Sequence, residues 1–350
     1  MIPSWLEQPS ASINQQAKEA AEQHQQQLTK PPGSLGQLET LAIKLASMQG
    51  VKRPTLERPH ITVFAGDHGI AAEGVSAFPQ AVTAEMVRNF SRGGAAICIL
   101  ARENHAYLEV VNTGTVSEIE PLDGVFDARI APGTANFSHE AAMTPEQLIR
   151  ALDIGRSAAI RADELEAQLF IAGEMGIANT SSATALSCAL LNLPAEKLAG
   201  PGTGLTAEGV AHKVDVINNA LQRHAKALIN PIDALQHFAG FEIVAIVGAY
   251  IRCAQLGIPV LVDGFITTAA ALAAVHIKPD VKKWLVYSHT SQEPGHAALI
   301  QALEAHPLLN LQMRLGEGSG AATALPLLHL ACSLHSHMAT FEEAAISGKL

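Results

Sequence analysis

Carboxylates beside glycines recur at four places along this 350-residue chain. Three of them follow short apolar runs that predict β-strands, and the fourth lies in a run of glycines. The four segments are Gly66-Asp67-His68-Gly69, Gly173-Glu174-Met175-Gly176, Asp263-Gly264 and Gly316-Glu317-Gly318-Ser319-Gly320. Ligands bind in the crevice outside the carboxyl ends of parallel strands. Although glycine alone is common in turns, its repeated pairing with an acid predicts one acidic small-molecule site.

Glu317 is the strongest candidate for proton transfer. It lies in a glycine-rich turn, and residues 321–332 after it are very apolar. A carboxylate in apolar surroundings has a raised proton affinity, which suits a general base near neutral pH. The alternative is a solvated turn glutamate without a catalytic role.

Two loops carry donors suited to an anion. Residues 179–182 lead into a helix expected to begin near Ser182, and a helix N-terminus presents free N–H groups, although ordinary N-capping also explains this pattern. Residues 200–204 form a second glycine-rich loop, and Lys213 follows it. Neither loop matches a nucleoside-triphosphate or dinucleotide motif. The pair favours the single phosphate of a mononucleotide.

Other reactive side chains have simpler interpretations. Asp67-His68 suggests a metal site or a triad, but histidines such as His289 and His296 have no ligand-like spacing, so structural or substrate-orienting hydrogen bonds are favoured. There is no G-x-S-x-G motif for a serine nucleophile. The scattered cysteines indicate neither a disulfide framework nor a zinc site; they are Cys98, Cys188, Cys253 and Cys332.

Composition limits the class of protein. Hydrophobic residues make up 48% of the chain and charged residues 16%, which favours a large core and, weakly, an oligomer. The net charge of −10 argues against nucleic-acid binding. No signal peptide is evident, and the apolar runs are too short or interrupted to span a bilayer. We therefore expect a cytoplasmic protein without membrane or nucleic-acid partners.

Strand and helix patterns alternate from about residue 58. The expected strands are residues 61–65, 107–112, 168–172, 258–262 and 284–287, and the expected helices between them include 79–90, 94–103, 144–161 and 182–191. This alternation predicts an α/β fold with a mainly parallel sheet covered by helices on both faces.

The chain ends have a different pattern. Residues 10–29 and 35–48 predict two helices before the first strand, and the chain after Gly320 reads as helical. We expect residues 1–57 to supply part of a small helical domain, 58–320 to form the large α/β catalytic domain, and 321–350 to form C-terminal helices packed partly on the small domain.

Seven segments, in order from residue 30 to residue 320, resemble the nicotinate-nucleotide:dimethylbenzimidazole phosphoribosyltransferase family. The matching segments are Lys30-Pro31-Pro32-Gly33-Ser34-Leu35-Gly36, Asp67-His68-Gly69, Glu73-Gly74-Val75-Ser76, Arg92-Gly93-Gly94-Ala95-Ala96, Gly173-Glu174-Met175-Gly176, Pro259-Val260-Leu261-Val262-Asp263-Gly264-Phe265 and Met313-Arg314-Leu315-Gly316-Glu317-Gly318-Ser319-Gly320. The resemblance covers nearly the whole chain, and the combination of motifs is highly specific.

The resemblance implies transfer of phosphoribose from nicotinate mononucleotide to dimethylbenzimidazole, a step that prepares the lower ligand of cobalamin. It implies that Glu317 is the general base and that Glu174 lies in the same catalytic site. The implied phosphoribosyl-binding residues are Gly176, Asn179, Thr180, Gly202, Lys213, Ser291 and Gly316. The implied acceptor-base pocket consists of Phe78, Met86, Met175 and Leu315. A homodimer with a Rossmann-like large domain is also implied, and we expect neither metal nor cofactor.

Two alternatives stay open. Some relatives have serine where Phe78 stands and glutamine where Met86 stands, so this pocket is more apolar, and the acceptor could be another aromatic base, a phenolic or a purine. A catalytically silent nucleotide-binding protein is the second alternative. The retained Glu317 and Glu174 argue against it, because a protein that only binds an anion gains nothing from nearby carboxylates.

Overall fold

A six-stranded parallel sheet forms the centre of the computed structural model, which describes residues 2–347. The strands are β1 (Pro59–Gly66), β2 (Tyr107–Gly114), β3 (Val125–Asp127), β4 (Leu169–Met175), β5 (Val260–Val262) and β6 (Leu285–Tyr287). They pair in the order β3-β2-β1-β4-β5-β6, and every pairing is parallel. This is the order of the doubly wound dinucleotide-binding fold, so the Rossmann-like α/β prediction is confirmed.

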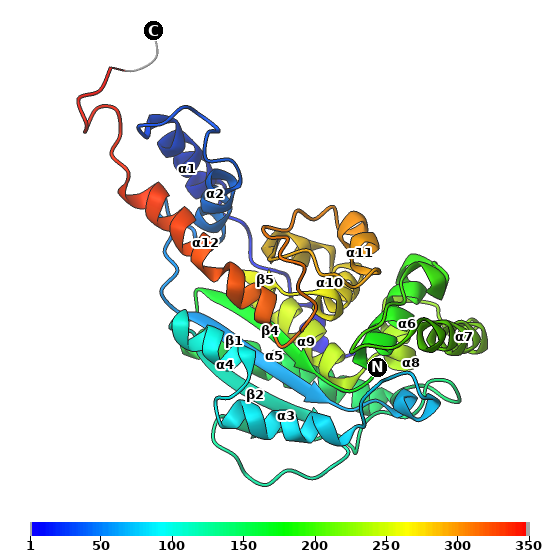
Figure 1. The fold of residues 1–350 in the computed structure, drawn as a ribbon. Coiled ribbons are helices and arrows are strands. Elements are labelled where there is room, and N and C mark those ends of the chain that lie inside the picture. Colours follow the sequence, from blue (N-terminus) through cyan, green and yellow to red (C-terminus); the bar gives the residue numbers. More distant parts are fainter. Residues whose placement is uncertain (1, 348–350) are drawn as a thin grey trace.

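The two central strands explain why the sequence pattern was readable. All of β1 is buried, as is β4 up to its last residue, because helices cover both faces of the sheet (Figure 1). Strands buried on both faces appear in the sequence as continuous apolar runs. By contrast β3 has only three residues, is partly exposed and lies at the sheet edge, and the sequence analysis missed it.

Most helices lie in the connections between strands, and the last two follow β6. After the chain-end helices α1 (Gln15–Gln27) and α2 (Gln37–Gln49), they are α3 (Ala81–Ser91), α4 (Ala96–Glu103), α5 (Pro145–Glu164), α6 (Asn179–Leu191), α7 (Ala207–His224), α8 (Pro231–Phe238), α9 (Phe241–Leu256), α10 (Phe265–Ile277), α11 (His296–Ala302) and α12 (Ser319–His337). Short 3₁₀ turns lie at Ser4–Glu7, Gly69–Glu73, Ala195–Lys197 and Pro279–Trp284. Within residues 2–347, no helix combines the length and the apolar character needed to cross a membrane.

Helices α5 and α9 pack with their backbones in contact. A Cβ on Gly155 of α5 would overlap the Ala245 carbonyl, and a Cβ on Gly248 of α9 would overlap the Leu152 carbonyl. Only glycine fits at both crossing points, so the two helices pack closely, and α9 also contacts β1, β2, β4 and β5. The packed pair of helices thus supports the sheet.

The two chain ends pack together, as expected. Helix α12 contacts α2, and the bridge between Leu28 and Thr340 joins the ends near α1 (Figure 1). Helix α12 also contacts α4 and β4, so this one helix packs both on the chain-end helices and on the α/β part of the protein. In the described part of the C-terminal segment, α12 is a single helix and turns follow it. The domain boundaries stay predictions, and their outermost positions, 1 and 348–350, lie outside the described residues.

Candidate active site

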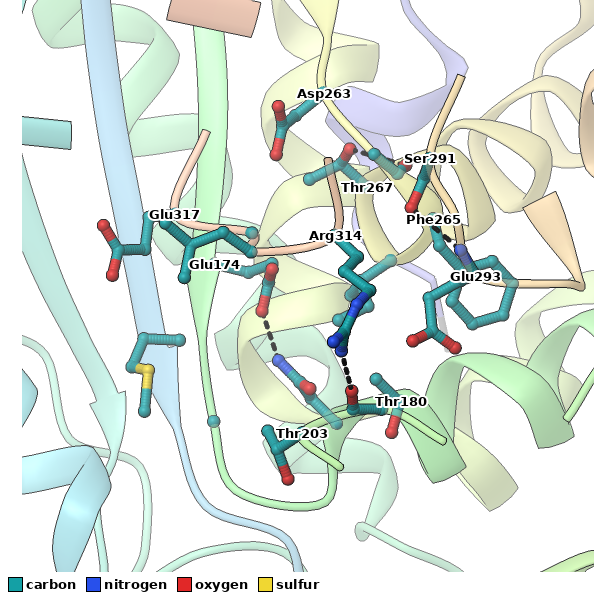
Figure 2. Close-up of a pocket in the computed structure, with 18 of the residues that line it drawn as sticks. Glu174, Thr180, Thr203, Asp263, Phe265, Thr267, Ser291, Glu293, Arg314 and Glu317 are labelled. Carbon is teal, nitrogen blue, oxygen red and sulfur yellow. Dashed lines mark hydrogen bonds between the residues drawn. The ribbon is translucent and has the colours of Figure 1, made fainter. Parts of the chain in front are cut away.

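The carboxyl ends of β4, β5 and β6 open into a cavity of about 390 Å³. One of these strands, β4, pairs with β1 at the point where the strand order changes direction. Figure 2 shows the carboxylates of Glu174, Asp263, Glu293 and Glu317 around the cavity, with Arg314 reaching across towards the loop that holds Thr203. The cavity is lined by these residues named from the sequence: Phe78, Met86, Glu174, Met175, Gly176, Asn179, Thr180, Gly202, Ser291, Leu315, Gly316 and Glu317.

Glu317 lies on a turn with unusual backbone geometry. Gly316, Glu317 and Gly318 have φ angles of 92°, 65° and 86°, so three successive residues are left-handed. The turn lies directly on β4, where a Cβ on Gly173 would overlap the Glu317 carbonyl. Left-handed geometry is unfavourable for a residue with a side chain, so it persists only where the surroundings hold it.

The Glu317 carboxylate is buried. Glu317 is only 6% exposed. Its Oε2 accepts a hydrogen bond of 3.3 Å from the Ile97 N–H at the start of α4. Burial raises the pKa of Glu317, the Ile97 N–H opposes this, and the negative charge of Asp263 raises it further. The alternative of a solvated turn glutamate is therefore wrong.

Glu174 stands beside that turn at the end of β4. Its carboxylate accepts a hydrogen bond from the Asn179 amide, and a Cβ on Gly316 would overlap its Oε1. Burial raises the pKa of Glu174 well above its usual range, and the charges of Asp263, Glu242 and Glu317 add to the effect. Four carboxylates this close together favour the protonated form of Glu174.

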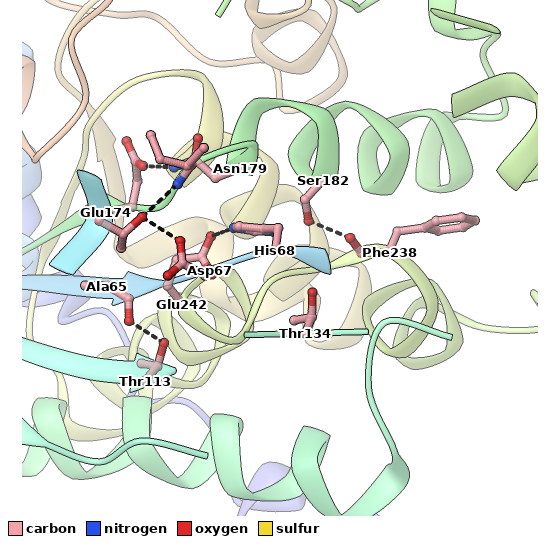
Figure 3. A network of polar contacts seen from close by, with 12 residues as sticks. Ala65, Asp67, His68, Thr113, Thr134, Glu174, Asn179, Ser182, Phe238 and Glu242 are labelled. Atoms are coloured by element: carbon pink, nitrogen blue, oxygen red, sulfur yellow. Dashed lines mark hydrogen bonds and ion pairs between the residues drawn. The ribbon is translucent and has the colours of Figure 1, made fainter. Parts of the chain in front are cut away.

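The pair Asp67-His68 has a structural place. Asp67 accepts hydrogen bonds from the Thr83 hydroxyl at 2.6 Å and the Val116 N–H at 2.8 Å. The ring of His68 lies 2.8 Å from Glu242 Oε1 (Figure 3). Neither Asp67 nor His68 lines the cavity. These contacts support the hydrogen-bonding interpretation, since they tie the end of β1 to neighbouring segments under the site.

A donor-rich region forms another part of the cavity. Lys213 of α7 is completely buried, and its Nζ donates to Thr180 Oγ1 at 2.8 Å and to the Gly200 carbonyl at 3.3 Å. Burial lowers the pKa of Lys213 to about 8. Lys213 does not line the cavity itself but reaches it through Thr180.

Helix α6 begins earlier than expected. Its first residue is Asn179, not Ser182, because Ala178 takes a left-handed φ of 74° and ends the turn there. Asn179 and Thr180 therefore lie in the first turn of the helix, and both line the cavity. A helix N-terminus beside a lysine is suited to an anionic group.

Apolar side chains form the mouth of the cavity. Phe78 is 50% exposed and Leu315 is 60% exposed, while Met86 and Met175 are half-buried. All four line the same cavity. A flat aromatic molecule entering here would cover apolar surface that is otherwise exposed to water.

Comparison with known proteins identifies the family of this chain. A family model described as phosphoribosyltransferase matches residues 10–346. The chain belongs to this phosphoribosyltransferase family. It is 55% identical over 349 residues to the nicotinate-nucleotide--dimethylbenzimidazole phosphoribosyltransferase of Pseudomonas putida (strain GB-1), and 57% identical over 347 residues to that of Xanthomonas campestris pv. campestris (strain B100). These alignments cover 100% and 99% of this chain, and 99% of each relative.

Solved structures support the same assignment. The chain is similar to the crystal structure of CobT from Thermus thermophilus, with a TM-score of 0.92 and 44% identity over 95% of this chain and 100% of that one. The chain is thus a phosphoribosyltransferase, as the resemblance implied. Among residues 2–347, no group of three or more His, Cys, Asp or Glu side chains is arranged to hold a metal ion.

The structure adds three charged cavity residues, Asp263, Glu293 and Arg314, that the sequence analysis did not name as site residues. Asp263 was predicted only as one of the four glycine-flanked acids of an acidic site, Arg314 appeared only within a matching segment, and Glu293 was not mentioned. Glu293 is buried with both carboxylate oxygens unpaired, and burial raises its pKa. Arg314 Nη1 donates to the Gly202 carbonyl at 3.4 Å. Arg314 directly precedes the Leu315-Gly316-Glu317 turn, which was the one available signal, whereas Glu293 has none.

Proposed function

We propose that this enzyme transfers phosphoribose from nicotinate mononucleotide to dimethylbenzimidazole, giving α-ribazole phosphate and nicotinate. The observation that carries the proposal is a buried carboxylate, Glu317, in the same cavity as the anion-binding end around Thr180. The activity named for full-length relatives at 54–57% identity supports this choice of substrates. The product would serve as the lower-ligand precursor of cobalamin.

The phosphate would bind at the N-terminus of α6. The Thr180 hydroxyl and the Lys213 ammonium group, 2.8 Å apart, supply a donor and a charge there. Lysine is a compact cation suited to phosphate. The remaining proposed contacts for the phosphoribosyl group are Gly176, Asn179, Gly202, Ser291 and Gly316.

Departure of nicotinate needs no strong acid. In the nucleotide the pyridine nitrogen is cationic, so breaking its bond to C1′ returns the electron pair and neutralises that charge. Positive charge then develops on the ribose, and the negative charge of the Glu317 carboxylate would stabilise it. Attack from the opposite face of the ribose gives the α-linked product.

Glu317 would act as the general base. As the benzimidazole nitrogen bonds to C1′, the ring must lose the proton on its second nitrogen, and the Glu317 carboxylate would take it. Burial raises the pKa of Glu317, which makes it a better base than a solvated glutamate. Holding both reactants in one cavity removes much of the entropic cost of bringing them together.

The acceptor pocket leaves a second candidate. Phe78 and Met86 give this pocket an apolar character that also suits a phenolic or a purine. An apolar pocket discriminates one methylene by only about 1–3 kcal/mol. The silent nucleotide-binding alternative is disfavoured, because burying Glu317 and Glu174 near a phosphate would only weaken binding.

We also propose the homodimer and the cytoplasmic location that the sequence analysis expected. The composition supports the dimer, because hydrophobic residues make up 48% of the chain and charged residues only 16%. Sedimentation at several protein concentrations tests the dimer, and a mass that stays at one chain would contradict it.

Product analysis tests the function. The protein is mixed with nicotinate mononucleotide with and without dimethylbenzimidazole, and the products are separated by chromatography. An α-ribotide formed only with acceptor, with an equal amount of nicotinate, supports the transferase. Nicotinate in both samples supports hydrolysis, and no product in either supports the binding protein. A panel of phenolics and purines then separates the acceptor candidates.

A further inference from the structure

Asp263, which lies two residues before α10, joins the end of β5 to the beginning of α12. Its Oδ1 accepts a hydrogen bond of 2.8 Å from the Ala321 N–H, and N–H groups of Gly320 and Gly318 also stabilise its carboxylate. Asp263 is 2% exposed. A buried carboxylate at the first turn of a helix satisfies N–H groups that have no partner within the helix, and it interacts favourably with the helix dipole.

This contact fixes the turn that carries Glu317. The turn consists of left-handed residues, and it is held from one side by β4, where Gly173 leaves no room for a Cβ. Asp263 holds it from the other side through the N–H groups that directly follow Glu317. Because left-handed geometry is unfavourable for Glu317, the turn needs both supports to keep the carboxylate in the cavity.

Asp263 also acts on the turn through its charge. Burial raises the pKa of Asp263, whereas His289 and the N–H groups of Ala321, Gly320 and Gly318 favour its charged form. The groups that face Glu317 are Glu174 from β4, Asp263 from the end of β5, and the Ile97 N–H and Cys98 thiol from α4. Of these, Asp263 raises the pKa of Glu317 by its negative charge, an effect second to that of burial among those that raise it. His289 Nδ1 lies 3.8 Å from Asp263 Oδ1 and bonds with the Ser288 hydroxyl.

We propose that Asp263 is a positioning residue of the reaction, which determines how Glu317 presents its carboxylate to the incoming base. It does so by anchoring the N-terminus of α12 and by keeping a negative charge beside the turn. This inference rests on the proposed role of Glu317 as the general base.

Two substitutions separate the anchor from the charge. Asp263→Asn keeps an oxygen that accepts the Ala321 N–H but removes the charge, so Glu317 becomes a weaker base that loses its proton more easily. The acid limb of the kcat/KM profile for dimethylbenzimidazole therefore moves to lower pH, and the plateau falls. Asp263→Ala also removes the anchor, and kcat falls by a further factor of about 10², the cost of small misplacement of a reacting group. The KM for nicotinate mononucleotide changes little in Asp263→Asn.

The control is Glu293→Gln, which removes another buried cavity carboxylate that does not contact the turn. It leaves the acid limb in place, whatever its effect on KM. Two results would overturn the proposal. In the first, the acid limb of the Asp263→Asn profile stays at the pH of the wild type. In the second, Asp263→Ala has the same kcat as Asp263→Asn. If Asp263→Ala does not fold, as circular dichroism would show, the pH profile of Asp263→Asn decides alone.

Glu317→Gln distinguishes this failure from failure of the proposed function. If Glu317→Gln is slow and lacks the acid limb while Asp263→Asn matches the wild type, Glu317 keeps its role and Asp263 loses its own. If Glu317→Gln keeps full activity, the general base lies elsewhere and both assignments fail.

Discussion

The ammonium group of Lys213 lies 2.8 Å from the Thr180 hydroxyl although the lysine is completely buried. No carboxylate within 4.0 Å pairs with it among the described residues, and the charge of Glu293 acts on it only from beyond that distance. A buried cation without a close counter-ion is unfavourable unless an anion joins it. The phosphate of the nucleotide meets this requirement.

Lys213 predicts a pH dependence of substrate binding. Burial lowers the pKa of Lys213 to about 8, so the charged form is lost as pH rises through that value. We expect the KM for nicotinate mononucleotide to be constant below this pH and to rise above it. Steady-state kinetics on either side of that pKa measures the change. Lys213→Gln should have a high KM at all pH values, and the same rise in this variant would contradict the assignment.

Glu317→Gln should slow catalysis without abolishing binding. Loss of a general base typically costs about 10²–10⁴-fold in rate, because the proton must leave without help. We expect that loss in kcat with the KM for nicotinate mononucleotide nearly unchanged. Exposed Glu304, which pairs with Lys282, provides the control Glu304→Gln with wild-type rates. Full activity of Glu317→Gln would exclude the role.

Gly173→Ala should damage both stability and activity. Its Cβ would overlap the carbonyl of Glu317, so the turn must move off β4. Overpacking of this kind costs typically about 1–3 kcal/mol in the free energy of unfolding. Gly209→Ala in α7 is the matched control, because a Cβ there meets only the flexible Leu205 side chain. Urea unfolding and kcat are the measurements, and equal behaviour of the two variants would show that the turn has room.

Two buried histidines predict an acid-sensitive contact between the chain ends. His24 Nε2 donates to the His335 carbonyl at 2.9 Å, and His335 accepts from the Gln25 amide at 2.8 Å while donating to the Lys52 carbonyl at 2.9 Å. Burial lowers the pKa of both histidines below the usual 6.5. Their contribution to stability is present above pH 6.5 and is lost as pH falls through the lowered values.

Hydrogen exchange of α1 and the end of α12 measures this effect as the pH is lowered from neutral to acid. Exchange there should accelerate at low pH more than in β1. His335→Gln should weaken the pH dependence, whereas His337→Gln, at an exposed position, should keep it. Uniform exchange across the protein would contradict a local effect.

The sequence predicted what local pattern encodes. Runs such as residues 61–65 are apolar because both faces of the sheet are covered. Such runs are why every strand except β3 was predicted. The start of α6 was wrong by three residues because Ala178, not a glycine, takes the left-handed turn. Glu293 was missed because its place in the cavity arises from packing of segments far apart in the sequence.

Helix α12 runs from the turn of Glu317 to the chain ends, and its 19 residues span about 28 Å. This single helix, which contains Pro326, thus has one end beside the cavity and the other part against α2. Any substitution between α12 and α2 that tilts α12 will displace the Glu317 carboxylate, although the substituted residue lies far from it. Mutations that impair catalysis should therefore be found far outside the cavity, with substrate binding largely intact.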